Sequence, residues 1–130
     1  MTDQVVVDLD DGSWEMQVEK GRAPVVIMYF SENCPYCKQM EPYFLEYARE
    51  FREKVTFARI DIAKNSWTAE RYAIRSTPTF GFFCSGKLVQ QLVGSVYPAI
   101  LKRSVEEILL HGKECAEHST EINYEITGYG

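Results

Sequence analysis

Two cysteines stand three residues apart in the segment Cys34-Pro35-Tyr36-Cys37. Proline is favoured in the first turn of a helix, so Cys34 is expected at a helix N-terminus. Unpaired backbone N–H groups and the positive end of the helix dipole stabilise a thiolate there. A thiolate attacks disulfides, and a second thiol one turn further along can resolve the mixed disulfide that forms. The spacing therefore predicts a redox-active dithiol, with Cys34 as nucleophile and Cys37 as the more covered resolving thiol.

Cysteine pairs of this spacing also occur in metal sites, which leaves a second interpretation. Cys115 and His118 form a C-x-x-H pair near the C-terminus. Together with Cys34 and Cys37 they would complete a Cys₃His zinc set, as in a metal-binding or redox-sensing module. Cys115 could instead be a third thiol that reacts with the pair, or an exposed thiol without function. Cys84 ends an apolar run and is expected to be a small buried residue.

The composition is that of one globular domain without membrane or nucleic-acid partners. The chain has 130 residues, of which 45% are hydrophobic and 25% are charged. The net charge is −5 and there is no basic run, which argues against nucleic-acid binding. The longest apolar stretch, Val25 to Phe30, is too short to span a bilayer. The start, Met1-Thr2-Asp3-Gln4, lacks the positive segment of a signal peptide, so we expect a cytoplasmic protein.

Strand-like and helix-like patterns alternate along the chain, which predicts an α/β fold in the order β-α-β-α-β-α-β-β-α. Val25 to Phe30 is apolar on both faces, as in a central strand. The helix that carries the cysteines is expected from Pro35 to about Arg52. The other expected elements are strands at Val5–Leu9, Val55–Ile62, Thr79–Cys84 and Lys87–Val93, a hairpin turn at Ser85-Gly86, and helices at Ser13–Lys20, Ser66–Tyr72 and Pro98–Leu110.

The last residues of the chain differ from the rest in charge and pattern. Residues 113–130 hold one lysine and four glutamates, a net charge of −3, and lack helical periodicity. The remaining charge of −2 leaves a nearly neutral body. We therefore expect a domain over residues 1–112 and an acidic, mobile C-terminal extension over residues 113–130.

Several stretches, in this order and at these spacings, resemble the thioredoxin family between about Trp14 and Leu110. They are Val25 to Lys38, Pro42, Arg75 to Phe80, Ser85-Gly86-Lys87 and Val93-Gly94. The resemblance implies a thioredoxin fold, with a central mixed sheet of about five strands flanked by about four helices. It also implies a monomeric protein-disulfide oxidoreductase that acts on protein disulfides. Such an enzyme needs no dissociable cofactor or metal and takes its electrons from a separate reductase.

The resemblance also implies how a substrate docks. Pro78 would be a cis-proline facing the cysteine pair, and the backbone of Thr77 would pair with an extended substrate segment. Pro35 and Tyr36, between the cysteines, would contact the substrate, with Tyr36 facing solvent. The other aromatic residues around the site are expected in the core: Tyr29, Phe30, Tyr43, Phe80, Phe82 and Phe83.

The residues around the first cysteine depart from the thioredoxin pattern. Asn33 stands where thioredoxins usually have tryptophan, and Pro35-Tyr36 is the dipeptide typical of glutaredoxins. This predicts a reduction potential nearer roughly −200 to −230 mV than about −270 mV. The Gly-Gly with a following Asp, with which glutaredoxins bind glutathione after the cis-proline strand, is not visible, which argues against the use of glutathione. Because of the Pro35-Tyr36 dipeptide, a glutathione-coupled, glutaredoxin-type enzyme stays an alternative.

A second departure concerns the proton of the resolving thiol. Met28 stands where thioredoxins have a buried acid that helps to accept this proton. We therefore expect slower reduction of substrates at neutral pH. Glu32 and Asp61 are the nearest acidic residues in the sequence, and both are expected to be solvated. Arg59 stays charged at all ordinary pH values, so it can only stabilise a nearby anion.

Overall fold

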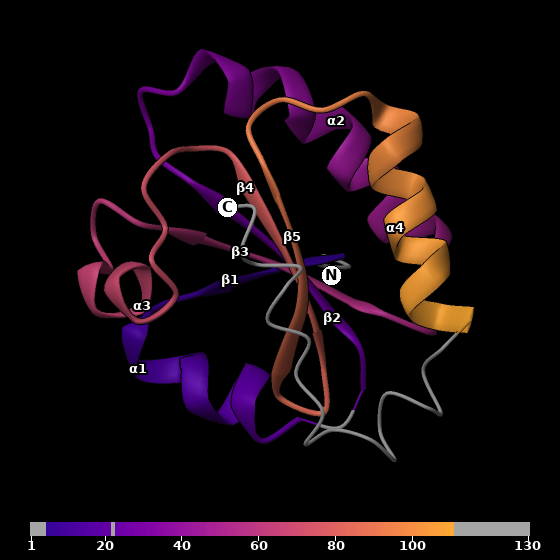
Figure 1. The fold of residues 1–130 in the computed structure, drawn as a ribbon, viewed down its shortest axis with the longest axis horizontal. Helices are drawn as coiled ribbons and strands as arrows, with labels where there is room; N and C mark the ends of the chain where they lie inside the picture. The colour runs from indigo at the N-terminus through magenta and orange to yellow at the C-terminus, as the bar shows by residue number, and fades with distance from the viewer. Residues whose placement is uncertain (1–4, 22, 111–130) are drawn as a thin grey trace, which may run out of the picture.

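The computed structural model describes residues 5–21 and 23–110 as one five-stranded sheet with helices on both faces (Figure 1). The strand order is β1-β3-β2-β4-β5. Strands β1 and β2 run parallel to β3, whereas β4 is antiparallel to β2 and β5 to β4. The elements are β1 (Val6–Leu9), α1 (Asp11–Trp14), the π-helical η1 (Glu15–Glu19), β2 (Val25–Phe30), α2 (Pro35–Glu50), β3 (Thr56–Asp61), α3 (Ser66–Arg71), β4 (Thr79–Cys84), β5 (Lys87–Val93) and α4 (Pro98–Leu110). The predicted α/β class and element order are confirmed.

The central strand β2 supplies side chains to both hydrophobic layers. Successive side chains of a strand point to opposite faces of the sheet. Val26 and Met28 join the cluster under α2 and α4, while Ile27 and Tyr29 join the cluster under α1, η1 and α3. Figure 1 shows α2 and α4 together on one side of the sheet and α1 and α3 on the other. The molecule therefore has two separate cores, and the cysteine helix belongs to one of them.

Helix α2 carries the cysteine pair and is fixed by its buried face. Cys34 is the N-cap and Pro35 the first helical residue, as predicted. The helix continues through Pro42 and ends at Glu50, two residues before the predicted end. Its buried residues recur at helical spacing: Cys37, Met40, Phe44, Tyr47 and Ala48. This packing holds the N-terminus of α2 at one end of the sheet.

The first helix starts earlier than the sequence pattern predicts. It begins at Asp11, because the side chain of Asp10 accepts a hydrogen bond of 2.8 Å from the backbone N–H of Ser13. The Ser13 hydroxyl in turn accepts one of 3.0 Å from the Asp10 N–H. Ser13 is therefore the N3 residue of a capping box, the third residue of the helix, rather than its start. The expected range Ser13–Lys20 was wrong for this reason.

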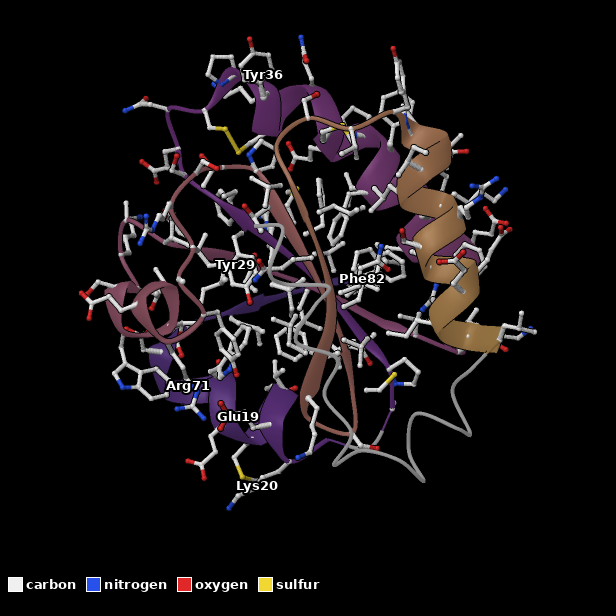
Figure 2. All side chains as sticks on the ribbon, in the orientation of Figure 1. Glu19, Lys20, Tyr29, Tyr36, Arg71 and Phe82 are labelled. Atoms are coloured by element: carbon white, nitrogen blue, oxygen red, sulfur yellow. A yellow bond between two sulfur atoms is a disulfide. The ribbon has the colours of Figure 1, made fainter. Side chains whose placement is uncertain are left out.

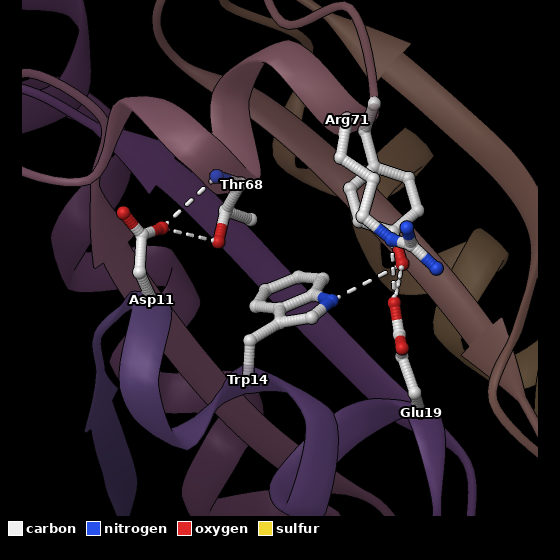
Figure 3. Close-up of polar contacts among 6 residues, drawn as sticks. Asp11, Trp14, Glu19, Thr68 and Arg71 are labelled. Carbon is white, nitrogen blue, oxygen red and sulfur yellow. Dashed lines mark hydrogen bonds and ion pairs between the residues drawn. The ribbon is translucent and has the colours of Figure 1, made fainter.

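Asp11 caps a second helix, α3, from outside it (Figure 3). One Asp11 carboxylate oxygen accepts hydrogen bonds from the Thr68 N–H at 2.9 Å and the Thr68 hydroxyl at 2.6 Å. Asn65, the N-cap of α3, makes no capping bond with its own side chain. The Asn65 side-chain oxygen instead accepts the backbone N–H of Asp11 at 2.8 Å. The starts of α1 and α3 therefore satisfy each other's free N–H groups.

A second polar contact joins η1 to the end of α3 (Figure 3). The indole N–H of the fully buried Trp14 donates to the Tyr72 hydroxyl at 3.1 Å. Burial raises the pKa of Tyr72, so its hydroxyl stays protonated and donates to Glu19 at 2.8 Å. Arg71 donates to the same carboxylate at 2.7 Å. These bonds hold α1, η1 and α3 together on the face away from α2.

The hairpin between β4 and β5 turns at Ser85-Gly86, as predicted. Both residues have positive φ, +51° and +82°, as two-residue hairpin turns require. A Cβ atom on Gly86 would collide with the backbone carbonyl oxygen of Glu19. Cys84, at the end of β4, is buried in the core as expected.

The C-terminal predictions fall mostly beyond the described residues. The predicted extension over 113–130, with Cys115 and His118, lies outside them, so its boundary and properties stay predictions. Within residues 5–21 and 23–110, no helix combines the length and the apolar character needed to cross a bilayer.

Candidate active site

Cys34 and Cys37 form a disulfide at the N-terminus of α2 (Figure 2). Their Cα atoms are 5.2 Å apart, which is an ordinary separation for a disulfide. The backbone N–H of Cys37 donates to the Cys34 sulfur at 3.1 Å. This N–H is one of the unpaired donors at the start of the helix, so it remains available to a thiolate at Cys34 after reduction. The two cysteines that were predicted to form a redox-active pair thus lie together at the predicted N-terminus of the helix.

The two sulfur-bearing residues are covered, while the residues between them are open. Cys34 is 6% exposed and Cys37 is 4% exposed, so Cys37 is the more covered residue by only a small margin. Pro35 and Tyr36 are exposed, and Tyr36 reaches 58%. Figure 2 shows Tyr36 at the outer end of α2 beside the disulfide, pointing away from the sheet. Tyr36 faces solvent as predicted.

Three loops meet at the end of the sheet that carries the disulfide. The Thr77–Pro78 peptide bond is cis and directly precedes β4. Thr79 pairs with Tyr29 near the end of β2, so the start of β4 lies where β2 leads towards Cys34. The Ser31 and Thr77 hydroxyls are 3.3 Å apart, and the Pro78 carbonyl accepts the Gly94 N–H at 2.7 Å. The loops after β2, before β4 and after β5 are therefore joined here.

A pocket of about 170 Å³ opens beside Cys37 and contains an arginine between two carboxylates. Arg59 donates to Asp8 at 2.6 Å and to Glu41 at 3.0 Å. The hydrogen bond to Asp8 is the main cause that raises the pKa of Arg59, so the guanidinium stays charged. Met28, Cys37, Glu41 and Arg59 all line this pocket. Met28 thus presents an apolar wall to the resolving cysteine.

The acidic residues near Cys37 are only partly those that the sequence suggested. Glu32 is exposed and pairs with Lys64 at 3.1 Å, as expected of a solvated residue. Asp61 is buried, so its expected exposure was wrong. Its carboxylate accepts the Ala63 N–H at 2.9 Å and holds the turn after β3. Glu41 was not anticipated, although its position four residues after Cys37 puts both on neighbouring positions of one helix.

The aromatic residues divide between core and surface. Tyr29, Phe80, Phe82 and Phe83 are fully buried, as expected. Tyr43 is 41% exposed, so its predicted place in the core was wrong. The buried stripe of α2 passes through Met40, Phe44 and Tyr47, which leaves Tyr43 at the edge of this stripe.

The zinc interpretation stays a prediction, because half of its ligand set lies outside the described residues. The sulfurs of Cys34 and Cys37 are bonded to each other in the structure, and both would have to be reduced to thiolates to hold a metal. Cys115 and His118 lie outside the described residues. Within residues 5–21 and 23–110, no three His, Cys, Asp or Glu side chains are grouped as metal ligands would be.

Comparison with known proteins gives one family. The thioredoxin family model matches residues 5–107. The chain is 36% identical over 101 residues to thioredoxin from Acidithiobacillus ferridurans, covering 78% of this chain and 93% of that protein. It is 32% identical over 91 residues to thioredoxin from Pseudomonas aeruginosa, covering 70% and 84%. It is also 30% identical over 105 residues to the chloroplastic thioredoxin M4 of Arabidopsis thaliana, covering 81% of this chain.

The match with this chain covers a different share of each relative's own length. The matched region spans 54% of the Arabidopsis protein, and 57% and 58% of the chloroplastic M-type thioredoxins of Brassica napus and Spinacia oleracea. It spans most of the two bacterial proteins. The shared region includes both cysteines and the cis peptide bond of this chain.

Proposed function

The chain belongs to the thioredoxin family, and on this basis we propose that it is a thiol-disulfide oxidoreductase that exchanges electrons with protein disulfides. The observation that carries the proposal is the Cys34–Cys37 disulfide at the N-terminus of α2. A disulfide between residues three apart can open and close without a large change in the backbone. The same two sulfurs can therefore carry two electrons to a substrate and be reduced again.

In the proposed reaction the reduced dithiol transfers two electrons to the substrate. The Cys34 thiolate attacks one sulfur of a substrate disulfide, which forms a mixed disulfide and releases the first substrate thiolate. Cys37 loses its proton and attacks the Cys34 sulfur, which releases the second substrate thiolate. The released thiolates take up protons, and the Cys34–Cys37 disulfide is restored. The substrate is reduced and the enzyme is oxidised by the same two electrons.

Docking is proposed at the junction of the three loops. Thr77 is half-buried and Pro78 is buried beside the start of β4. Thr77 lies before β4 begins, so we propose that its backbone pairs with an extended segment of the substrate. Pro35 and Tyr36 form the opposite, exposed side. We propose that these four residues contact the substrate.

The cycle needs a partner but no bound cofactor. A separate reductase would return two electrons to the Cys34–Cys37 disulfide, since the dithiol is consumed once per turnover. We propose that the protein works as a monomer in the cytoplasm, where thiols are kept reduced. Its relatives include thioredoxins from two bacteria and chloroplastic thioredoxins from plants.

The test is reduction of a protein disulfide with dithiothreitol as electron donor. The wild-type chain is expected to accelerate the reaction, and the Cys34→Ser variant to lose this acceleration while keeping its melting temperature. Zinc bound in stoichiometric amount, without turnover, would support the metal-binding alternative instead. Activity that appears only with glutathione would support a glutaredoxin-type enzyme.

The apolar wall beside Cys37 gives a second prediction. Met28 is 2% exposed and lines the same pocket as Cys37 and Arg59. The Met28→Asp variant would place a carboxylate there that can accept the proton of Cys37. Positioned acids and bases contribute about 10²–10⁴-fold, so a gain of about tenfold in kcat/KM near pH 7 is expected. The measurement is kcat/KM for a protein disulfide between pH 5 and 9.

Met28→Asn is the matched control, because it has the size and polarity of aspartate without a titratable group. Only Met28→Asp should change the shape of the pH profile. Equal profiles for the two variants would mean that proton transfer from Cys37 does not limit turnover. Both variants are expected to melt at a lower temperature than wild type, because a polar group replaces the buried apolar side chain of Met28.

A further inference from the structure

A groove of about 700 Å³ lies next to the active site, between α2 and the segment that leads from β5 into α4. Gln39, Met40 and Tyr43 of α2 form one wall. Val96 and Tyr97 before α4, with Ile100 in its first turn, form the other. Its volume is within the range of about 300–1,000 Å³ that is usual for ligand sites. We call it the tyrosine groove.

The tyrosine groove exposes apolar surface that is not needed for the core. Tyr97 is 82% exposed, and Tyr43 and Ile100 are 41% and 40% exposed. None of the side chains that line the groove is charged, although one residue in four of the whole chain is charged. A contiguous exposed apolar patch on a water-soluble domain commonly marks a contact site.

The groove is continuous with the surface around the disulfide. Tyr36 and Tyr43 are seven residues apart on α2, which is two helical turns, so both lie on one face of the helix. On the other wall, the Gly94 N–H is bonded to the Pro78 carbonyl at 2.7 Å, two residues before Val96. The groove therefore adjoins the proposed docking region on both walls, through α2 on one side and through the Gly94–Pro78 contact on the other.

We propose that the tyrosine groove is a specificity site that binds a large apolar or aromatic side chain of the protein substrate, next to the cysteine that is attacked. This inference rests on the proposed function and adds the substrate preference. Tyrosine suits such a site, because its ring gives a large contact area with little loss of conformational freedom. The uncharged lining offers no partner for the carboxylates of a small charged thiol, so a polypeptide segment is the occupant that fits.

The test compares groove variants on three disulfide substrates. Two are peptides with the same disulfide, flanked in one by phenylalanine and leucine and in the other by serine and aspartate. The third is hydroxyethyl disulfide, which is too small to reach the groove. The variants are Tyr97→Ser and Tyr43→Ser. Trp67→Ser is the control, because Trp67 is also an exposed aromatic residue, at 48%, but lies on α3 on the opposite face.

The wild-type chain is expected to prefer the apolar peptide. Each tyrosine variant should lower kcat/KM for that peptide by about fivefold to tenfold, in line with the loss of one aromatic contact at an interface. The rates for the polar peptide and for hydroxyethyl disulfide should not change, and Trp67→Ser should behave as wild type.

Three results would each overturn one of the two proposals, and each result identifies which proposal fails. Equal wild-type rates on both peptides, with hydroxyethyl disulfide still reduced, would overturn the groove alone. A wild-type chain that reduces none of the three substrates would overturn the proposed function. A dimer in light scattering that Tyr97→Ser converts to a monomer would show that a second copy of the chain occupies the groove.

Discussion

The Cys37→Ser variant is expected to accumulate as a covalent adduct with its substrate. The Cys34 thiolate can still attack a disulfide, but no second thiol stands beside it to release the product. Resolution then depends on an external thiol, which loses the advantage of a positioned intramolecular group, so turnover should fall by at least about 100-fold. The adduct is measured by mass spectrometry of the intact protein under non-reducing conditions.

The Cys34→Ser variant is the matched control for this experiment. The Cys34 sulfur stands at the N-cap of α2 and accepts the Cys37 N–H, which stabilises a thiolate at Cys34 rather than at Cys37, so Cys37 should not replace Cys34 as the attacking group and no adduct is expected. Addition of dithiothreitol should release the substrate from Cys37→Ser in its reduced form. An adduct of equal yield in both variants would show that the attack takes place at another cysteine, and would contradict the assigned roles.

The Gly86→Ala variant is expected to lose about 3 kcal/mol of unfolding free energy, which is large for the addition of one methyl group in a half-buried turn. Two costs add up. A left-handed backbone, here φ +82°, costs a residue with a Cβ atom about 1–2 kcal/mol. The new Cβ atom would also collide with the backbone carbonyl of Glu19, and relief of such a clash costs about 1–3 kcal/mol. The measurement is urea denaturation followed by circular dichroism.

Gly94→Ala separates the two costs. Gly94 also has positive φ, +90°, but a Cβ atom there would meet nothing within 4 Å. This variant should therefore lose only the backbone cost, about 1–2 kcal/mol. Equal losses in the two variants would mean that η1 moves away from the hairpin without resistance.

Much of the fold was predictable because strands and helices differ in the period of their apolar residues. The boundaries of β2, β4, β5 and α4 agree with the sequence pattern to the residue. The start of the first helix was not predictable in the same way. Asp10 and Ser13 are both good N-cap residues, and only their mutual hydrogen bonds decide that Asp10 is the cap. The capping of α3 by Asp11 joins residues 57 apart in sequence, which no local pattern reveals.

The part of the site that depends on neighbouring residues in the sequence was predictable. The cysteine pair and its place at the N-terminus of a helix follow from the four consecutive residues Cys34 to Cys37. The pocket beside Cys37 did not follow, because Arg59 and Glu41 come together only through the packing of α2 on β3. The tyrosine groove was missed for a related reason. Periodicity shows which face of a helix is apolar, but whether Tyr43 is covered depends on how closely the start of α4 approaches.

The arrangement of aromatic residues also decides what intrinsic fluorescence can report. Both tryptophans of the chain, Trp14 and Trp67, belong to the elements on the face away from α2. A disulfide quenches indole emission on contact, and Asn33 rather than an indole precedes Cys34. Emission should therefore hardly change between the oxidised and reduced protein. Because Trp14 is fully buried, the same signal should shift strongly to longer wavelength on unfolding. Tryptophan fluorescence should therefore report the folding of the chain and not the redox state of the Cys34–Cys37 pair.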